Sequence, residues 1–171
     1  AIEKFVKYAC ATHMSDPANI LDAGIISINK EIYDMAISNK DYSGMGTTFV
    51  ACTLVDNHVY ISNVGDSRLY LIGRDIRQIT RDHSLVEDMV RMGMIEKEEA
   101  KTHYKKNVIT KAIGVAEDRT ATPDIFEIEI SAGEKLLLCS DGLTNMVDDY
   151  EIKRIVHKNE RIEDAVRVLI D

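Results

Sequence analysis

Closely spaced strand-like segments in the first half of the chain constrain its fold most. These segments are rich in β-branched side chains and comprise residues 47–55, 59–64, 69–72 and 76–79. Turn-forming residues separate them at 56–57, 65–67 and 73–75. Connections this short leave no room for a crossover helix, so consecutive strands are expected to pair antiparallel, as a meander.

Amphipathic helices are predicted at both ends of the chain. Residues 2–10 and 16–39 carry apolar side chains at three- and four-residue spacing. Pro17 directly after Asp16 is typical of a helix start, where a capping side chain precedes proline in the first turn. Residues 149–157 and 161–170 show the same periodicity. Each helix therefore has one apolar face that a sheet can cover.

Two further strands are predicted in the second half of the chain. Residues 124–130 alternate apolar and acidic side chains, which is typical of a strand with one buried face. Residues 135–139 contain three consecutive leucines and are expected to form a central, buried strand.

Residues 82–111 are more charged and less apolar than the segments on either side, so they are expected to form an excursion from the sheet. Asp82 is predicted to cap a short helix that ends near Gly93. A second short helix is predicted at residues 97–101.

Composition excludes several classes of protein. The chain has 171 residues and a formal net charge of −8, with 45% hydrophobic residues, which fits one soluble domain and is too apolar for a disordered chain. No stretch approaches the roughly 18 apolar residues of a membrane span. Because the longest basic run is the pair Lys105–Lys106, nucleic acid is not expected as a partner.

The cysteines indicate a reducing compartment. Cys10, Cys52 and Cys139 are far apart, odd in number and set in apolar surroundings, so they are expected to be reduced core residues of a cytoplasmic protein. They also lack the basic neighbours that an activated thiolate needs. The first residue is Ala1 rather than Met, and no signal peptide precedes it, so we expect the chain to be cut from a longer one.

Two aspartates stand at strand ends beside glycine. Asp66 follows the strand at 59–64 across Gly65, and Asp141 follows the strand at 135–139 and precedes Gly142. A carboxylate at such a position projects from a rigid frame and can hold a small hard cation. Carboxylates without histidine or cysteine companions favour Mg²⁺ or Mn²⁺ over zinc. Spacing alone leaves open that both residues only form turns.

Five short motifs occur in a fixed order. They are Gly44-Met45-Gly46-Thr47-Thr48, Val64-Gly65-Asp66-Ser67-Arg68, Asp82-His83-Ser84, Ile109-Thr110-Lys111-Ala112-Ile113-Gly114 and Cys139-Ser140-Asp141-Gly142-Leu143. Their succession resembles the metal-dependent protein Ser/Thr phosphatases, the PPM family of type 2C, especially its bacterial branch. The resemblance covers essentially the whole chain, and five motifs in this order are specific.

The resemblance implies an α+β fold, an antiparallel β-sandwich flanked by helices on both faces in four layers. In the family, carboxylates at the sheet ends hold two Mn²⁺ or Mg²⁺ ions whose shared water attacks the phosphorus of phosphoserine or phosphothreonine. By match, Asp141 is a ligand of this pair, and Asp66 with Asp141 corresponds to a third metal site. Residues 82–111 match the family's mobile flap subdomain.

The chain also departs from the family pattern. The opening Asp-Gly-Met-Gly-Gly motif, the closing Gly-x-Asp-Asn motif and the phosphate-binding arginine of the first strand are absent. Residues 1–171 are therefore expected to form one incomplete phosphatase-like domain, truncated at both ends. A cation with so few protein ligands is expected to bind weakly, and the chain alone to hydrolyse phosphoesters poorly. Exposed sheet edges are expected to allow dimerisation.

Other polar side chains are given structural roles. Arg68 is predicted to pair with a carboxylate rather than to bind phosphate. His83 is predicted to cap a helix or anchor the flap rather than to act in catalysis. No role is assigned to His103, and His13, His58 and His157 are expected at the surface.

Two classes of function remain. The first is an enzyme that dephosphorylates proteins modified by a Ser/Thr kinase. The second is a non-catalytic binding or regulatory module with the same fold. The presence of both Asp66 and Asp141 favours the enzyme. The sequence that flanks the chain in its reading frame discriminates between them, because it either contains the two missing motifs or lacks them.

Overall fold

The computed structural model describes residues 1–11, 16–115 and 122–171. Its helices are α1 (Ile2–Ala11), α2 (Pro17–Ser38), α3 (Leu85–Arg91), α4 (Lys97–Thr102), α5 (Asp141–Thr144), α6 (Asp149–Lys158) and α7 (Ile162–Ile170), with a 3-10 turn η1 (Lys40–Tyr42). Its strands are β1 (Phe49–Val55), β2 (His58–Val64), β3 (Arg68–Ile72), β4 (Ile76–Gln78), β5 (Asp124–Glu129) and β6 (Lys135–Cys139). Every predicted strand is present, and its ends differ from the predicted ones by at most two residues.

The long helix α2 shows why the predicted helices form where they do. Asp16 caps its N-terminus by accepting a 3.0 Å hydrogen bond from the Ala18 N–H, and Pro17 occupies the first turn. The apolar stripe of α2 is buried, with Ile25 and Ile28 almost fully inaccessible. Capping and periodicity therefore fix both the start of α2 and the face that it turns to the sheet.

The strands form two antiparallel sheets, in the orders β1-β2-β5 and β4-β3-β6. The hairpins β1–β2 and β3–β4 confirm the predicted antiparallel neighbours. The predicted continuous meander is wrong, because β2 pairs with β5 whereas β3 pairs with β6. Residues 65–67 therefore carry the chain from one sheet to the other, instead of turning back within one sheet.

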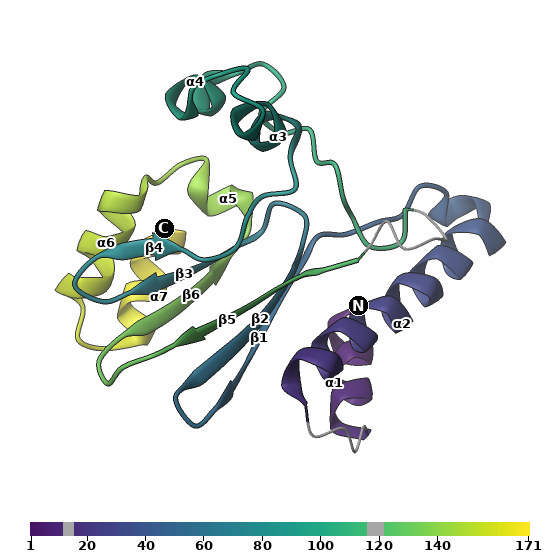
Figure 1. The fold of residues 1–171 in the computed structure, drawn as a ribbon, viewed down its shortest axis with the longest axis horizontal. Coiled ribbons are helices and arrows are strands. Elements are labelled where there is room, and N and C mark those ends of the chain that lie inside the picture. The colour runs from purple at the N-terminus through teal and green to yellow at the C-terminus, as the bar shows by residue number, and fades with distance from the viewer. Residues whose placement is uncertain (12–15, 116–121) are drawn as a thin grey trace.

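The two sheets and the helices make four layers, which confirms the predicted α+β sandwich with helices on both faces (Figure 1). Helix α2 covers the β1-β2-β5 sheet, where Ile25 and Ile28 share a core with Phe49 and Val64. Helices α6 and α7 cover the other sheet through a second core. Val59, Ile61 and Leu69, all completely buried, fill the space between the sheets.

Strand β6 is not the central strand that its leucines predict. Within the described residues it pairs only with β3 and forms an edge of its sheet. The side chain of Leu138 is 41% exposed. Three consecutive leucines place side chains on both faces of a strand, but the pattern does not show whether a neighbouring strand covers its edge.

The segment 82–111 leaves the sandwich and carries α3 and α4, which lie beyond the end where β6 leads into α5 (Figure 1). The sequence predicts Asp82 as the cap of α3, and this prediction is wrong. The cap is Ser84, whose hydroxyl oxygen accepts a 3.3 Å hydrogen bond from the Glu87 N–H.

Across the described residues, no helix is both long and apolar enough to cross a membrane.

Candidate metal centre

Sheet register brings the two predicted metal ligands to the same end of the sandwich. Arg68, the first residue of β3, pairs with Cys139, the last residue of β6. Asp66 lies two residues before this pair on one strand, and Asp141 lies two residues after it on the other. An antiparallel pair therefore places both carboxylates beyond the same edge, although 75 positions (141 − 66) separate them in sequence.

The two carboxylates influence each other electrostatically. Burial raises the pKa of the Asp66 carboxyl, and the negative charge of Asp141 raises this pKa further. Asp141 is the first residue of α5, is exposed, and accepts a 3.2 Å hydrogen bond from the Asn145 amide. Two neighbouring carboxylates that repel each other favour a cation between them.

Gly65 gives the Asp66 loop its shape. Its φ is +105°, a conformation that L side chains rarely adopt. A Cβ at this position would lie 2.3 Å from Cγ2 of Thr48, and Thr48 itself is fixed by a 2.9 Å hydrogen bond between its hydroxyl and that of Ser67. The Gly-Thr-Thr and Gly-Asp-Ser motifs therefore pack against each other, and only glycine fits between them.

Hydrogen bonds hold both polar backbone groups of Gly65. Its N–H donates to Nδ1 of His83 at 2.9 Å, and its carbonyl oxygen accepts from the His83 N–H at 3.0 Å. The same carbonyl accepts a 3.2 Å hydrogen bond from the side chain of Asn63, which also donates to the Arg81 carbonyl at 2.9 Å. The residue before Asp66 is thus immobilised by two buried side chains.

His83 also contacts two charged groups through its other ring nitrogen. Nε2 lies 3.3 Å from Oδ1 of Asp124 and 3.3 Å from Nζ of Lys111, which itself lies 3.3 Å from the same Asp124 oxygen. Burial lowers the pKa of His83, and the charge of Lys111 lowers it further, against the opposite effect of Asp124. The imidazole is therefore stabilised in its neutral form.

Arg68 pairs with a carboxylate, as the sequence predicts. Its guanidinium donates to both Asp82 oxygens, with Nε–Oδ1 at 2.9 Å and Nη2–Oδ2 at 2.7 Å. Asp82 also accepts from Gln78 at 2.9 Å, and Arg68 donates to the Tyr70 hydroxyl at 3.0 Å. This arrangement uses the planar fork of the arginine in a bidentate pair with Asp82.

The oxygen donors of Asp66 and Asp141 suit Mn²⁺ or Mg²⁺, but they do not complete a site. Over residues 1–11, 16–115 and 122–171, no three or more His, Cys, Asp or Glu side chains form a group that could hold a metal ion. A hard divalent cation takes six or more oxygen ligands, so a site with two protein carboxylates leaves most positions to water. The described residues fit the chemistry of the metal and lack the number of ligands that tight binding needs.

Sequence reasoning missed part of this site. Asn63 sits at the end of a buried strand, and only its polar type in a fully buried position could have drawn attention to it. His83 does not cap a helix: it attaches the start of the segment 82–111 to the Asp66 loop through its two hydrogen bonds with Gly65, a contact that the sequence did not indicate. Asp148 caps α6 by accepting from the Glu151 N–H at 2.8 Å.

The remaining histidines and the cysteines lie away from these contacts. His103 accepts a hydrogen bond from the Lys105 N–H, His58 pairs with Glu127, and His157 bonds the Gly73 carbonyl; His13 lies outside the described residues. Cys10 is exposed, so its predicted core position is wrong; the residue that α1 buries is Phe5. Burial raises the pKa of the Cys139 thiol to about 11 and that of Cys52 in the same direction, which disfavours the reactive thiolate.

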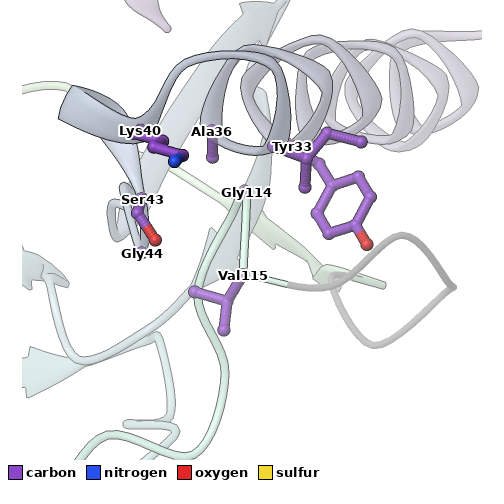
Figure 2. A pocket seen from close by; sticks show the side chains of 8 residues that line it. Tyr33, Ala36, Lys40, Ser43, Gly44, Gly114 and Val115 are labelled. Atoms are coloured by element: carbon purple, nitrogen blue, oxygen red, sulfur yellow. The ribbon is translucent and has the colours of Figure 1, made fainter.

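A hollow of about 330 Å³ is lined by residues of a different region, between the end of α2 and Gly114. Figure 2 shows Tyr33 and Lys40 on its α2 side, facing Val115. None of the side chains that surround Asp66 or Asp141 lines it. Its lining offers one cation, one phenol and the hydroxyl of Ser43, but no carboxylate that could hold a divalent cation.

Comparisons with known proteins identify the family to which the chain belongs. The family described as "Protein phosphatase 2C" matches residues 2–89. A serine/threonine phosphatase of Listeria innocua is 43% identical over 151 residues, which are 88% of this chain and 59% of that protein. The solved structure of serine/threonine phosphatase Stp1 from Staphylococcus aureus is 40% identical, with a TM-score of 0.90 over 99% of this chain and 69% of that one. The chain belongs to the protein phosphatase 2C family.

Other members of the family resemble the chain to a similar extent. Protein phosphatase PhpP of Streptococcus pneumoniae is 38% identical over 143 residues. The solved catalytic domain of the serine/threonine phosphatase PstP, in complex with two manganese ions, is 30% identical with a TM-score of 0.84. The chain spans somewhat less than two thirds of the curated relatives it matches, 59% of the Listeria protein and 57% of PhpP.

Proposed function

We propose that the protein is a phosphoserine and phosphothreonine protein phosphatase that uses a metal-activated water, and that this chain supplies part of its catalytic domain. The observation that carries the proposal is the Arg68–Cys139 register, which brings Asp66 and Asp141 to one end of the β4-β3-β6 sheet. Family membership supports the reaction class, and relatives that are 38–43% identical over the aligned residues are named as phosphatases.

In this proposal Asp66 and Asp141 hold the cation, Mn²⁺ or Mg²⁺. The metal, when bound, supplies a water of lowered pKa and positive charge for the phosphoryl oxygens. The chain's own contribution is placement: the two carboxylates project from fixed strand ends, and Gly65 is immobilised directly before Asp66. Arg68 is held by Asp82 and takes no part in phosphate binding.

The proposed substrates are phosphoproteins, products of a Ser/Thr kinase, in the cytoplasm. The net charge of −8 and the absence of long basic runs argue against nucleic acid as a partner. Residues 1–171 are proposed as one incomplete phosphatase-like domain, with residues 82–111 as a flap subdomain beside the carboxylates. The uncovered edge of β1 is the proposed surface for self-association.

Because two carboxylates leave most cation ligands to water, we expect weak Mn²⁺ binding by this chain. Calorimetric titration with Mn²⁺ tests this directly. Asp66→Asn and Asp141→Asn are each expected to weaken binding at least about tenfold, since each removes one of the two charged ligands. Asp75→Asn is the matched control, because Asp75 lies in the β3–β4 turn at the opposite end of β3, where its carboxylate pairs with Lys153. Equal affinities in all four proteins would contradict the assignment.

Phosphate release from a phosphothreonine peptide in the presence of Mn²⁺ tests the activity. The 171-residue chain is expected to turn over far more slowly than the same chain extended by the residues that flank it in its reading frame. An extended chain without activity, or one whose activity survives Asp141→Asn, would contradict the proposed enzyme.

The alternative function is a non-catalytic binding or regulatory module. One observation favours it: in the described part of the chain, metal-binding side chains gather in no group of three or more. The flanking sequence decides between the two. An Asp-Gly-x-Gly-Gly motif upstream and an Asp-Asn pair downstream support the enzyme, and their absence supports the module.

A further inference from the structure

We propose that His83 is a positioning residue for the Asp66 carboxylate and that it links both ends of the segment 82–111 to this carboxylate through Gly65. This inference rests on the proposed function, because it concerns the placement of a proposed metal ligand. It goes beyond that function by identifying which buried contact fixes the position of Asp66 and which segment of the fold can displace this residue.

The first step is the pair of hydrogen bonds between His83 and Gly65. The Gly65 N–H donates to the ring at Nδ1, and the His83 N–H donates back to the Gly65 carbonyl. His83 is 7% exposed, so water cannot easily replace the ring nitrogen. An apolar side chain of similar size would fill the same space and leave the buried Gly65 N–H without an acceptor. Packing alone therefore does not account for a histidine here.

The second step is the tautomer of the ring. Because Nδ1 accepts the Gly65 hydrogen bond, the proton of the neutral ring is assigned to Nε2, where Oδ1 of Asp124 lies 3.3 Å away. Asp124 thus holds the tautomer that keeps the Nδ1 lone pair available, as a carboxylate does when it accepts the ring N–H of a metal-binding histidine. Nζ of Lys111 lies 3.3 Å from the same Asp124 oxygen and balances its charge.

The third step is the attachment of the segment 82–111. Its first residues are bound to the Asp66 loop by His83 and by the Asp82–Arg68 pair. Its last residues return to the same place, because the Thr110 N–H donates to the His83 carbonyl at 2.8 Å and Ile109 bridges to Ser84. His83 is therefore the residue on which both ends of the segment and the Asp66 loop converge.

The consequence is a mechanical link. A shift of the segment's base moves His83, and the two Gly65 hydrogen bonds carry this shift to the peptide that precedes Asp66. Ligand positions need to hold to a fraction of an ångström for a metal site to work, so a small displacement changes cation binding.

Two matched amide variants test the inference. In His83→Asn the side-chain oxygen can take the place of Nδ1, whereas in His83→Gln the longer chain carries the amide group towards the place of Nε2. Hydrogen–deuterium exchange of the Gly65 amide is the first readout, with the Leu69 amide, which donates to Thr80, as internal reference. We expect exchange of Gly65 to rise on the order of tenfold in His83→Gln and to stay near wild type in His83→Asn.

The second readout is the Mn²⁺ concentration that half-broadens the amide resonances of Asp66 and Ser67. It is expected to rise several-fold in His83→Gln and to remain close to the wild-type value in His83→Asn, on the scale of one lost hydrogen bond. Asp75→Asn, in the β3–β4 turn at the opposite end of β3 from Gly65, is the control and is expected to leave Gly65 exchange unchanged. A purely structural role predicts equal effects of Asn and Gln at position 83.

Each outcome decides a different claim. Equal Gly65 exchange in the Asn and Gln variants overturns the positioning role of His83, whatever the metal does. Faster Gly65 exchange in His83→Gln with an unchanged Mn²⁺ midpoint overturns the link to Asp66. Wild-type resonances at Asp66 that no Mn²⁺ concentration broadens overturn the proposed metal site instead, while the exchange data still decide the role of His83.

Discussion

At the scale of single residues, Gly65 occupies a position that no other residue fits. Its φ of +105° already disfavours a side chain, and a Cβ would also lie 3.1 Å from the Thr48 Cα, a backbone atom that cannot swing away. Gly65→Ala is expected to destabilise the protein by about 3 kcal/mol, from strain and overpacking together. Urea denaturation measures this value.

Gly133 provides the matched control for Gly65. It has a similar φ of +90°, but a Cβ there meets no atom within 4 Å. Gly133→Ala is expected to cost about 1 kcal/mol, the conformational part alone. If both substitutions cost the same, the close packing of Thr48 against Gly65 does not contribute, and the Asp66 loop is less constrained than its contacts indicate.

Local sequence placed Asp66 and Asp141 at strand ends beside glycine, but spacing alone left open that both only form turns, and the family resemblance was needed to indicate a shared metal site. The contacts that hold them were not predictable in the same way. His83 meets Gly65 across 18 positions and Asp124 across 41 (124 − 83), and no local pattern encodes such a distance. Long-range hydrogen bonds depend on how two sheets stack, which a single sequence does not show.

At the scale of elements, the segment from Asp82 to Ser84 illustrates how capping was misassigned. Asp82 and Ser84 are both good capping residues two positions apart, so sequence alone does not separate them. The decisive factor is Arg68, whose guanidinium takes both oxygens of Asp82 and leaves Ser84 to begin α3. The same lack of tertiary information made the crossing at residues 65–67 look like a third hairpin.

This assignment predicts unequal effects of two alanine variants. Ser84→Ala removes the cap of α3 and is expected to cost about 1 kcal/mol. Asp82→Ala leaves the largely buried Arg68 guanidinium without its carboxylate, so a loss of about 2–3 kcal/mol is expected. Thermal or urea unfolding measures both, and Arg68→Met is the control background. A loss from Asp82→Ala that persists undiminished in Arg68→Met would contradict the pairing.

At the scale of the whole molecule, the four layers bury three separate hydrophobic cores. The edge strands of the two sheets differ in length and charge. Strand β5 carries Glu127 and Glu129 at its exposed positions, and β4 is only three residues long. Charged and short edges resist pairing with another chain. Strand β1, by contrast, has seven residues without a charge, and its Leu54 is 58% exposed. Among the described strands, β1 therefore offers the edge most open to a second strand.

We expect the chain to self-associate through β1, forming a reversible dimer whose sedimentation coefficient rises with concentration. Leu54→Lys places a charge on this edge in both copies and is expected to weaken the dimer by roughly tenfold without loss of monomer stability. Leu138→Lys on the β6 edge is the control, because it leaves β1 unchanged and is expected to preserve the dimer. A monomer at every concentration accessible to sedimentation velocity would contradict self-association, and equal weakening by both variants would contradict the choice of β1.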